Sequence, residues 1–426
     1  MTGSRVSIRT FGCRANQYES AMMRRLLGQA AAESDGGKDV HVLNACTVTG
    51  VADRKARQAA RRFRREHPDA LIVAIGCLAD AVDRGLARFP EVDLLAGNAW
   101  KTRIVDVVSR VRSGERGVLP AIDPEPLAAE LSGGNPRRVR AFLKVQDGCG
   151  RACTYCRTTQ VRGAPRSKPL DAVGAEAEAL VAAGFPELVL TGIDLAQYAP
   201  PDGDLAAAVT RLLAIHGLRR LRIASIAPSG LTHRLIEAVA SDHRACPHFH
   251  VPIQSGDDRI LRAMARGYAV ADVLERIDVV RATIPSATFG ADLIVGFPAE
   301  DEVAFENTCR LVEAAALVNV HAFRFSSRPG TVAAELPDRV PAAVARRRAD
   351  ALASRWRARL RGLLDNRIGS THHVLVEERR GDEWRGYTSD YLYVHFASQA
   401  DVPIGSIRPV RIVAVAEDHL EGTIDD

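Results

Sequence analysis

Residues 144–166 read KVQDGCGRACTYCRTTQVRGAPR, and this stretch decides how the whole chain is interpreted. It places Cys149, Cys153 and Cys156 in a C-x3-C-x2-C pattern within eight residues. Three thiolates on one short loop can hold three irons of a four-iron cluster and leave the fourth iron open. A structural zinc site is the alternative, but it needs four closed ligands, and no histidine lies nearby in the sequence to complete a tetrahedron. The triplet therefore predicts an iron–sulfur centre with one open position.

The composition indicates a soluble protein of several domains. A length of 426 residues suggests two to four domains, and 46% hydrophobic residues support substantial cores. The net charge of +5 is mildly basic and only weakly favours a polyanionic partner. No apolar stretch reaches the roughly 18 residues of a membrane helix, and no signal peptide is expected. We expect a cytoplasmic location without membrane contact, where eight cysteines favour metal or redox use over disulfides.

The first part of the chain alternates strand-like and helical runs, which predicts a parallel α/β sheet. Cys13, Cys46 and Cys77 each follow one of the first three strands, at spacings of 33 and 31 residues. Because the carboxyl ends of parallel strands meet at one edge, these cysteines are expected to converge into a second three-thiolate site. Three small buried hydrophobic residues are the alternative. The expected strands are 4–10, 39–44, 70–75 and 92–96, and the expected helices are 17–31, 51–66, 79–89 and 101–112.

The helix expected after Cys46 carries arginines on one side and an alanine stripe on the other. Arg54, Arg57 and Arg61 belong to the arginine side. Such a run is usually a solvated face. The alternative is a surface that contacts RNA phosphates.

Residues 113–139 are rich in glycine and proline and are expected to connect two domains over the surface. Strand–helix units then resume, and six of them suit an open six-unit β/α barrel whose site lies at the carboxyl ends of the strands. Four candidate residues follow those strands, although tight turns and helix caps would explain them as well. These candidates are Gly192, Asp194, Ser225 and Gln254, and the expected strands are 141–145, 187–191, 220–225, 248–253, 291–295 and 321–325.

The end of the chain changes character. Residues 341–366 have the periodicity of one long helix. The strands expected at 373–377, 386–396 and 407–416 then predict a small antiparallel barrel. Tyr391 on one of them could stack on bases, or it could be a half-buried strand aromatic.

The cysteine triplet, with Tyr155 in its aromatic slot, resembles the radical S-adenosylmethionine (SAM) enzymes. Gln146-Asp147-Gly148 before the triplet and Arg162-Gly163 after it are similar to the methylthiotransferase branch. The resemblance implies that the triplet holds a 4Fe-4S cluster whose open iron chelates SAM. It also implies that the four strand-end candidates contact SAM. Three positions depart from the usual pattern of the branch, which has Pro at Thr159, Glu at Ala227 and Gly at Ala299.

The resemblance extends to both ends of the chain. Methylthiotransferases hold an auxiliary 4Fe-4S cluster on three N-terminal cysteines. The short sequences around Cys13, Cys46 and Cys77 resemble the motifs that contain those cysteines. The stretch Thr47-Val48-Thr49, followed by Ala52-Asp53-Arg54, most resembles the branch that acts on threonylcarbamoyladenosine in tRNA. The C-terminal strands resemble a TRAM domain, which binds RNA.

These resemblances imply a tRNA methylthiotransferase that adds a methylthio group to C2 of N6-threonylcarbamoyladenosine beside the anticodon. Its expected partners are SAM, the tRNA anticodon stem-loop, an electron donor such as flavodoxin or ferredoxin, and a sulfur donor. The alternatives are methylthiolation of isopentenyladenosine, methylthiolation of a ribosomal-protein aspartate, and a non-enzymatic metal-containing RNA-binding protein. The expected domains are an N-terminal domain (1–112), a linker (113–139), the radical SAM core (140–330), a docking helix (331–370) and the TRAM-like domain (371–426).

Overall fold

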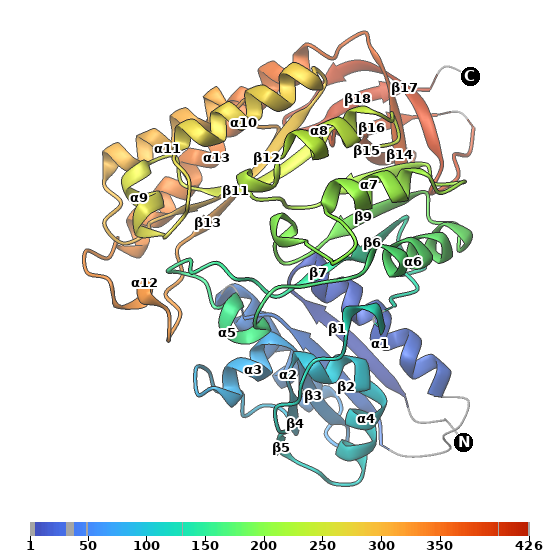
Figure 1. Ribbon diagram of the computed structural model, residues 1–426, viewed down its shortest axis with the longest axis vertical. Coiled ribbons are helices and arrows are strands. Elements are labelled where there is room, and N and C mark those ends of the chain that lie inside the picture. The colour runs from blue at the N-terminus through green and yellow to red at the C-terminus, as the bar shows by residue number, and fades with distance from the viewer. Residues whose placement is uncertain (1–4, 31–37, 48–49, 130, 399, 425–426) are drawn as a thin grey trace.

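The computed structural model describes residues 5–30, 38–47, 50–129, 131–398 and 400–424. Figure 1 shows an N-terminal sheet at the bottom, a set of core strands above it and a small barrel at the upper right. The three bodies follow one another along the chain, and together they confirm the expected fold class.

The N-terminal sheet has five parallel strands that lie side by side in chain order. All five side chains of the central strand are buried, as a strand covered by helices on both faces requires. The strands are β1 (Val6–Phe11), β2 (Val40–Ala45), β3 (Leu71–Ile75), β4 (Leu94–Ala96) and β5 (Gly117–Val118). Helices α1 (Arg14–Ala30) and α4 (Ile104–Arg112) share an apolar cluster on one face with the 3-10 helix η1 (Asn98–Arg103), and α2 (Gly50–Glu66) and α3 (Cys77–Asp83) share a cluster on the other.

Two details of this sheet differ from the sequence-based expectation. Helix α3 ends at Asp83 and does not reach residue 89, because Gly85 follows with a φ of 70°. Strand β5 lies within residues 113–139, so the stretch expected to connect two domains over the surface also adds the fifth strand of the sheet.

The core contains six parallel strands in two hydrogen-bonded groups, β6-β9-β10 and β11-β12-β13. Isolated bridges join the groups at Leu221–Ala245 and Ser225–His250, while β6 and β13 are not paired within the described residues, so the barrel is open. The strands are β6 (Arg140–Lys144), β9 (Glu187–Thr191), β10 (Arg220–Ile223), β11 (His248–Gln254), β12 (Thr288–Val295) and β13 (Asn319–Arg324).

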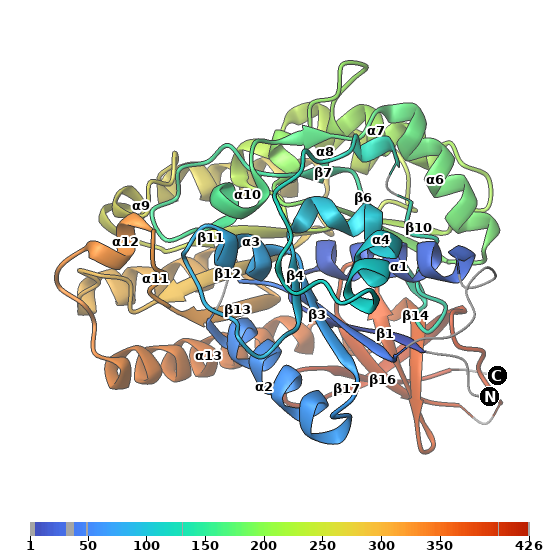
Figure 2. The ribbon, with the colours of Figure 1, turned by 90° about the horizontal axis from the view of Figure 1, so that it is seen from below.

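Helices cover the outside of the core strands and share one large apolar cluster with them. They are α6 (Leu170–Ala182), α7 (Leu205–Leu213), α8 (His233–Ala240), α10 (Val270–Thr283) and α11 (Glu302–Ala314). Figure 2 shows the long helix α13 (Ala342–Asp365) on the opposite side of the core from α6 and α7. Shorter elements form the loops: β7 (Gln146–Asp147), β8 (Arg166–Ser167), α5 (Thr158–Arg162), α9 (Asp258–Ala263), α12 (Val332–Glu335), η2 (Leu127–Ala129), η3 (Leu195–Gln197) and η4 (Pro228–Gly230).

The C-terminal strands close into a five-stranded barrel in the order β14-β15-β16-β18-β17. The expected small barrel is present, and four of its strand pairs are antiparallel, but the pair β16–β18 is parallel, so the barrel is mixed. The single strand expected at 386–396 is two strands, because the chain turns back near Tyr391, whose φ is 69°. The strands are β14 (Thr371–Arg380), β15 (Glu383–Thr388), β16 (Tyr393–Ala397), β17 (Ile407–Val415) and β18 (Leu420–Thr423).

This barrel docks against the starting ends of the core strands. Arg220 on β10 donates to the carbonyl oxygens of His373 (2.6 Å) and Tyr387 (3.0 Å). Arg222 donates to the carbonyl of Ser389 at 3.0 Å and to the Glu187 carboxylate at 2.8 Å. The barrel therefore covers the end of the core that lies opposite the cysteine-bearing loops.

We expect Ala299→Gly to raise the free energy of unfolding by roughly 1 kcal/mol, since Ala299 adopts a left-handed φ of 63° that penalises a Cβ atom. Its side chain is exposed, so the substitution removes little packing. Thermal unfolding is the measurement. As a matched control, Ala351→Gly on the exposed face of α13 should destabilise by about 1 kcal/mol. An unchanged or lowered midpoint of thermal unfolding for Ala299→Gly would show that the backbone at Ala299 is not strained.

Candidate active site

The C-x3-C-x2-C loop follows β6 and β7 and opens onto a cavity of about 400 Å³, which Cys149, Cys153 and Cys156 all line. The turn into the loop depends on Gly148, whose φ is 73°. A Cβ atom there would lie 2.0 Å from the carbonyl oxygen of Ala164, so no other residue fits. The backbone therefore presents all three thiols to one space.

Each of these sulfurs has a hydrogen-bond donor from the protein. Gln197 Nε2 lies 3.3 Å from the Cys149 sulfur, and Arg266 lies 3.1 Å from the Cys153 sulfur. The backbone N–H of Thr158 lies 3.4 Å from Cys156, whose thiol pKa is nevertheless raised, chiefly by burial. Donors aimed at sulfur suit thiolates that ligate iron, because such bonds stabilise and tune the cluster. The residues present therefore fit a 4Fe-4S cluster held on three ligands.

Three of the four SAM candidates line the same cavity: Asp194, Ser225 and Gln254. Asp194 accepts a hydrogen bond from Gln197 Nε2 at 2.6 Å and one from Arg151, while Gln254 has a φ of 82°. Gly192 is not among the lining residues, although its neighbours Ile193 and Asp194 are. The SAM contacts themselves stay a prediction.

A Cβ atom at Gly192 would lie 3.0 Å from Gln146, and the Oε1 atom of Gln146 accepts from the backbone N–H groups of Ile193 and Asp194 at 2.9 and 2.8 Å. Gly192 therefore allows Gln146 to hold the loop that carries Asp194.

The structure explains why threonine can replace the usual proline at position 159. Thr159 lies in the first turn of α5, where the backbone N–H has no partner within the helix, so proline and threonine both fit. The departure at Ala227 leaves a methyl group on the cavity wall.

The second cysteine triplet lies at one edge of the N-terminal sheet, after the carboxyl ends of β1, β2 and β3. A Cβ atom on Gly12 would come within 2.4 Å of the Cys46 Cβ, so the loop before Cys13 passes directly against Cys46. Cys46 and Cys77 are buried, whereas Cys13 is exposed and lines the same cavity as the radical-cluster cysteines. The N-terminal sheet thus contributes a thiol to the cavity of the core.

Asn98 connects Cys77 of the second triplet to helix α5, which follows the first triplet, and no sequence pattern identified this residue. Its Nδ2 atom lies 3.4 Å from the Cys77 sulfur and 3.0 Å from the carbonyl oxygen of Val161 on α5. Gln197 and Arg266, the donors to the first triplet, were also missed. All three belong to segments far in sequence from the sulfurs that they contact, so no local pattern could identify them.

A buried ion cluster joins the N-terminal sheet to the core. Glu19 on α1 accepts hydrogen bonds from Lys144 (3.0 Å) and Arg162 (2.7 Å) of the core and from Lys101 of η1. Arg162 also donates to Asp147 at 2.8 Å. Burial alone would raise the pKa of Glu19, but Arg162, Lys101 and Lys144 hold it well below its usual range. The two cysteine-bearing parts are therefore connected by paired charges that are almost entirely buried.

The candidate RNA-binding residues lie in two distant places. On α2, Arg57 and Arg61 pair with Glu91 at 3.4 and 2.7 Å, whereas Arg54 is exposed and has no hydrogen bond or ion pair in the described part of the chain. Tyr391 lies where the C-terminal barrel meets the core. Its ring stacks on His248 and Tyr387 at centroid distances of 4.7 and 4.8 Å, so its stacking contacts are already made within the protein.

Comparison with known proteins agrees with this geometry. Residues 143–312 match the model of the radical SAM superfamily, and residues 5–97 match the model described as uncharacterized protein family UPF0004. A cobalamin-binding radical SAM methyltransferase, TsrM of Kitasatospora setae, shares the fold with a TM-score of 0.54 at 16% identity, over 78% of this chain and 77% of that one. The fold and the cysteine loop therefore define a radical SAM enzyme.

Relatives of known name cover nearly the whole chain. The threonylcarbamoyladenosine tRNA methylthiotransferase MtaB of Rickettsia prowazekii is 34% identical over 98% of this chain and 97% of its own length. The tRNA-2-methylthio-N(6)-dimethylallyladenosine synthase of Alkalilimnicola ehrlichii is 33% identical over 100% and 98%. The chain belongs to the radical SAM methylthiotransferase family and is a tRNA methylthiotransferase.

Family membership implies a 4Fe-4S cluster with SAM, and the N-terminal match implies a second cluster. It also sets aside the non-enzymatic alternative. When bound, the first cluster supplies the electron that cleaves SAM. In the part of the chain that the structure describes, no helix is long and apolar enough to cross a membrane.

Proposed function

We propose that the substrate is N6-threonylcarbamoyladenosine beside the anticodon of tRNA, and that the product carries a methylthio group at C2. The observation that carries this proposal is the position of the segment that distinguishes the branches. Thr47 accepts hydrogen bonds from Arg328 (2.8 Å) and Arg157 (3.4 Å) of the core, and Asp53 pairs with Arg328. Residues 48 and 49 of this segment lie outside the described residues.

This segment lies close to the cavity. A Cβ atom on Gly50 would be 3.0 Å from the hydroxyl of Ser326, which lines the cavity with Cys13 and the radical-cluster cysteines. The segment that resembles the threonylcarbamoyladenosine branch therefore lies close enough to the cavity to influence which modified adenine enters it.

The residues of this chain would divide the work by location. Cys149, Cys153 and Cys156 would hold the cluster that serves SAM, while Asp194, Ser225 and Gln254 would orient SAM beside it. Cys13, Cys46 and Cys77 would hold the auxiliary cluster. The apolar parts of the cavity wall would exclude water from the reacting groups. An electron donor such as flavodoxin or ferredoxin, a sulfur donor and a cytoplasmic location belong to the same proposal.

The test is anaerobic reconstitution with SAM, a reductant, a sulfur source and tRNA, followed by mass spectrometry of the nucleosides. We expect 2-methylthio-N6-threonylcarbamoyladenosine from tRNA that carries the threonylcarbamoyl group. Methylthiolation of isopentenyladenosine alone would contradict the proposal and favour the substrate named in the Alkalilimnicola relative. A strain that lacks the gene but keeps its 2-methylthio-N6-threonylcarbamoyladenosine would also contradict the proposal.

We further expect Arg54→Ala to weaken binding of the tRNA and to lower the salt dependence of binding by about one phosphate contact. The reason is that Arg54 is exposed and unpaired within the described residues, so its charge is available to RNA. Arg61→Ala is the matched comparison and should have a smaller effect, because Glu91 already holds that guanidinium. Fluorescence anisotropy at several salt concentrations measures both. Equal salt slopes for Arg54→Ala and the wild type would exclude the contact.

A further inference from the structure

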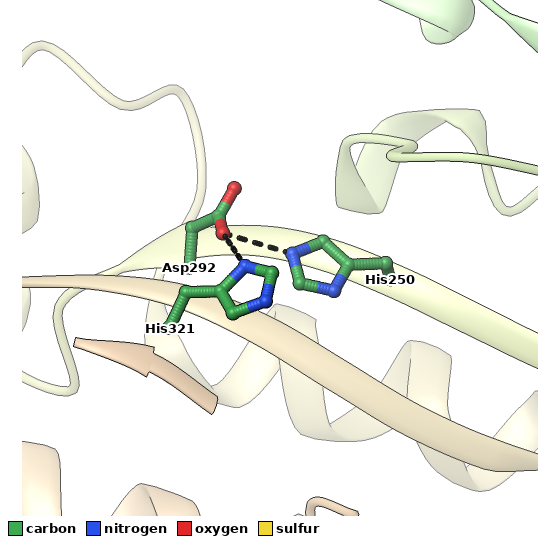
Figure 3. Close-up of side chains that lie close together, drawn as sticks. All are labelled: His250, Asp292 and His321. Carbon is green, nitrogen blue, oxygen red and sulfur yellow. Dashed lines mark hydrogen bonds and ion pairs between the residues drawn. The ribbon is translucent and has the colours of Figure 1, made fainter. Parts of the chain in front are cut away.

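Three polar side chains form a row across neighbouring strands of the core: His250 on β11, Asp292 on β12 and His321 on β13 (Figure 3). The strand register pairs Asp292 directly with His321. His250 Nε2 and His321 Nδ1 each lie 2.9 Å from the same oxygen, Oδ1 of Asp292. Both imidazoles thus hold one carboxylate in a fixed orientation.

The second oxygen of Asp292 is free. It takes no hydrogen bond from any described residue, and Figure 3 shows it pointing away from both rings. Burial alone would raise the pKa of Asp292, but the bonds from His250 and His321 hold it well below its usual range, so the group is ionised at neutral pH. Asp292 also lines the cavity that contains the cysteines. An ionised acceptor with one unused oxygen therefore faces this space.

Phe323 and Arg324 line the same cavity at the end of β13. Phe323 is 42% exposed, which is unusual for a large aromatic side chain, and its ring face offers a surface for stacking a base. Arg324 makes no hydrogen bond or ion pair within the described residues. The other two arginines that line the cavity are engaged, because Arg151 pairs with Asp194 and Arg266 donates to Cys153.

The wall therefore offers a stacking surface, a free anionic acceptor and an unpaired cation. The SAM candidates lie at the carboxyl ends of β9, β10 and β11, which leaves the wall at β12 and β13 for the second reactant. A hydrocarbon group on N6 of adenine would satisfy neither polar group. A group derived from an amino acid would satisfy both, since it carries N–H or O–H donors and a carboxylate.

We propose that Phe323, Asp292 and Arg324 form the recognition wall for an adenine whose N6 substituent contains an amino acid. Phe323 stacks on the base, Asp292 accepts from a urea N–H or the threonyl hydroxyl, and Arg324 meets the carboxylate. His250 and His321 act as positioning residues for Asp292. The inference rests on the proposed function and assigns its substrate selectivity to these residues.

The test uses the full chain with both clusters, titrated with three anticodon stem-loop RNAs. At the same adenine they carry the threonylcarbamoyl group, the isopentenyl group or no group. We expect the threonylcarbamoyl RNA to bind about tenfold to a hundredfold more tightly than the unmodified RNA. Arg324→Gln and Asp292→Asn should each reduce this ratio of affinities by about tenfold. Arg310→Gln, an exposed residue of α11, is the control and should change nothing.

The outcomes separate the wall from the proposed function. If the wild type methylthiolates threonylcarbamoyl tRNA but Arg324→Gln and Asp292→Asn keep the full affinity ratio, the wall is refuted while the function stands. If the wild type modifies only isopentenyl tRNA, the function itself fails. Two histidines and a carboxylate could instead hold a divalent cation. Stoichiometric zinc in the wild type that His321→Gln removes would assign the row to a metal and overturn the inference.

Discussion

Replacing Glu19 by glutamine is expected to lower the free energy of unfolding by about 3–5 kcal/mol, because it removes the carboxylate from a buried cluster of charges. Lys101, Lys144 and Arg162 would then be buried with one anionic partner fewer, while Asp147 would still pair with Lys144 and Arg162. The measurement is unfolding by denaturant or heat. Because Glu19 belongs to the N-terminal sheet and Arg162 to the core, contact between the two parts should weaken as well.

The matched control is Glu66→Gln on α2. Glu66 pairs with Arg62 at 2.7 Å, but both side chains are about half exposed, so the loss should be below about 1 kcal/mol. If the two substitutions lower the free energy of unfolding equally, burial does not make the Glu19 cluster more stabilising than an exposed ion pair.

The same cluster predicts how stability depends on pH. The pKa values of Glu19 and Asp147 are held well below their ordinary values of 4.5 and 3.8, chiefly by Arg162, although burial opposes the shift. Groups with a lowered pKa in the folded state stabilise it fully above their ordinary pKa, and this contribution is lost as the pH falls toward the folded value. Stability should therefore fall steeply below about pH 4.5, and less steeply in Glu19→Gln.

Cys153→Ala is expected to abolish cleavage of SAM and to remove about four irons per chain, since two thiolates remain to hold the cluster. Cys13→Ala should also remove iron and prevent transfer of the methylthio group, but it should leave SAM cleavage measurable. Iron and sulfide counting, with chromatography of 5′-deoxyadenosine, distinguishes the two variants. This pair tests whether the two triplets hold separate clusters.

Cys309→Ala is the control for both variants, because this cysteine is buried in α11 among apolar residues and belongs to neither triplet. It should keep all its iron and its activity and lose only modest stability. A loss of SAM cleavage in Cys13→Ala as complete as in Cys153→Ala would contradict the division of roles.

Local patterns were sufficient to predict the first four strands of the N-terminal sheet and the six strands of the core. The apolar runs of β3 and β9 and the alanine stripe of α2 are buried as their periodicity indicates. The convergence of Cys13, Cys46 and Cys77 at one sheet edge followed from the repeat of strand and helix. In the C-terminal barrel the prediction failed at 386–396, because a turn at a non-glycine residue with positive φ has no clear sequence signal.

Contacts between distant segments could not be predicted. The charges of Glu19, Lys144 and Arg162 are ordinary in sequence, and only the docking of α1 on the core pairs them. Tyr391 was expected as an exposed aromatic residue that binds RNA or as a half-buried one. Its stacking on His248 depends on docking between elements more than a hundred residues apart. The domain boundaries and the SAM contacts stay predictions.

The docking of the C-terminal barrel also bears on how the chain can be shortened. Arg140, Arg220 and Arg222 surround Glu187, and they rely on carbonyl oxygens of the barrel and on Glu377 for their remaining partners. A truncation before residue 371 would leave three guanidinium groups around a single carboxylate at the starting ends of the core strands. Residues 371–424 are thus an integral part of the enzyme's architecture and not a detachable accessory.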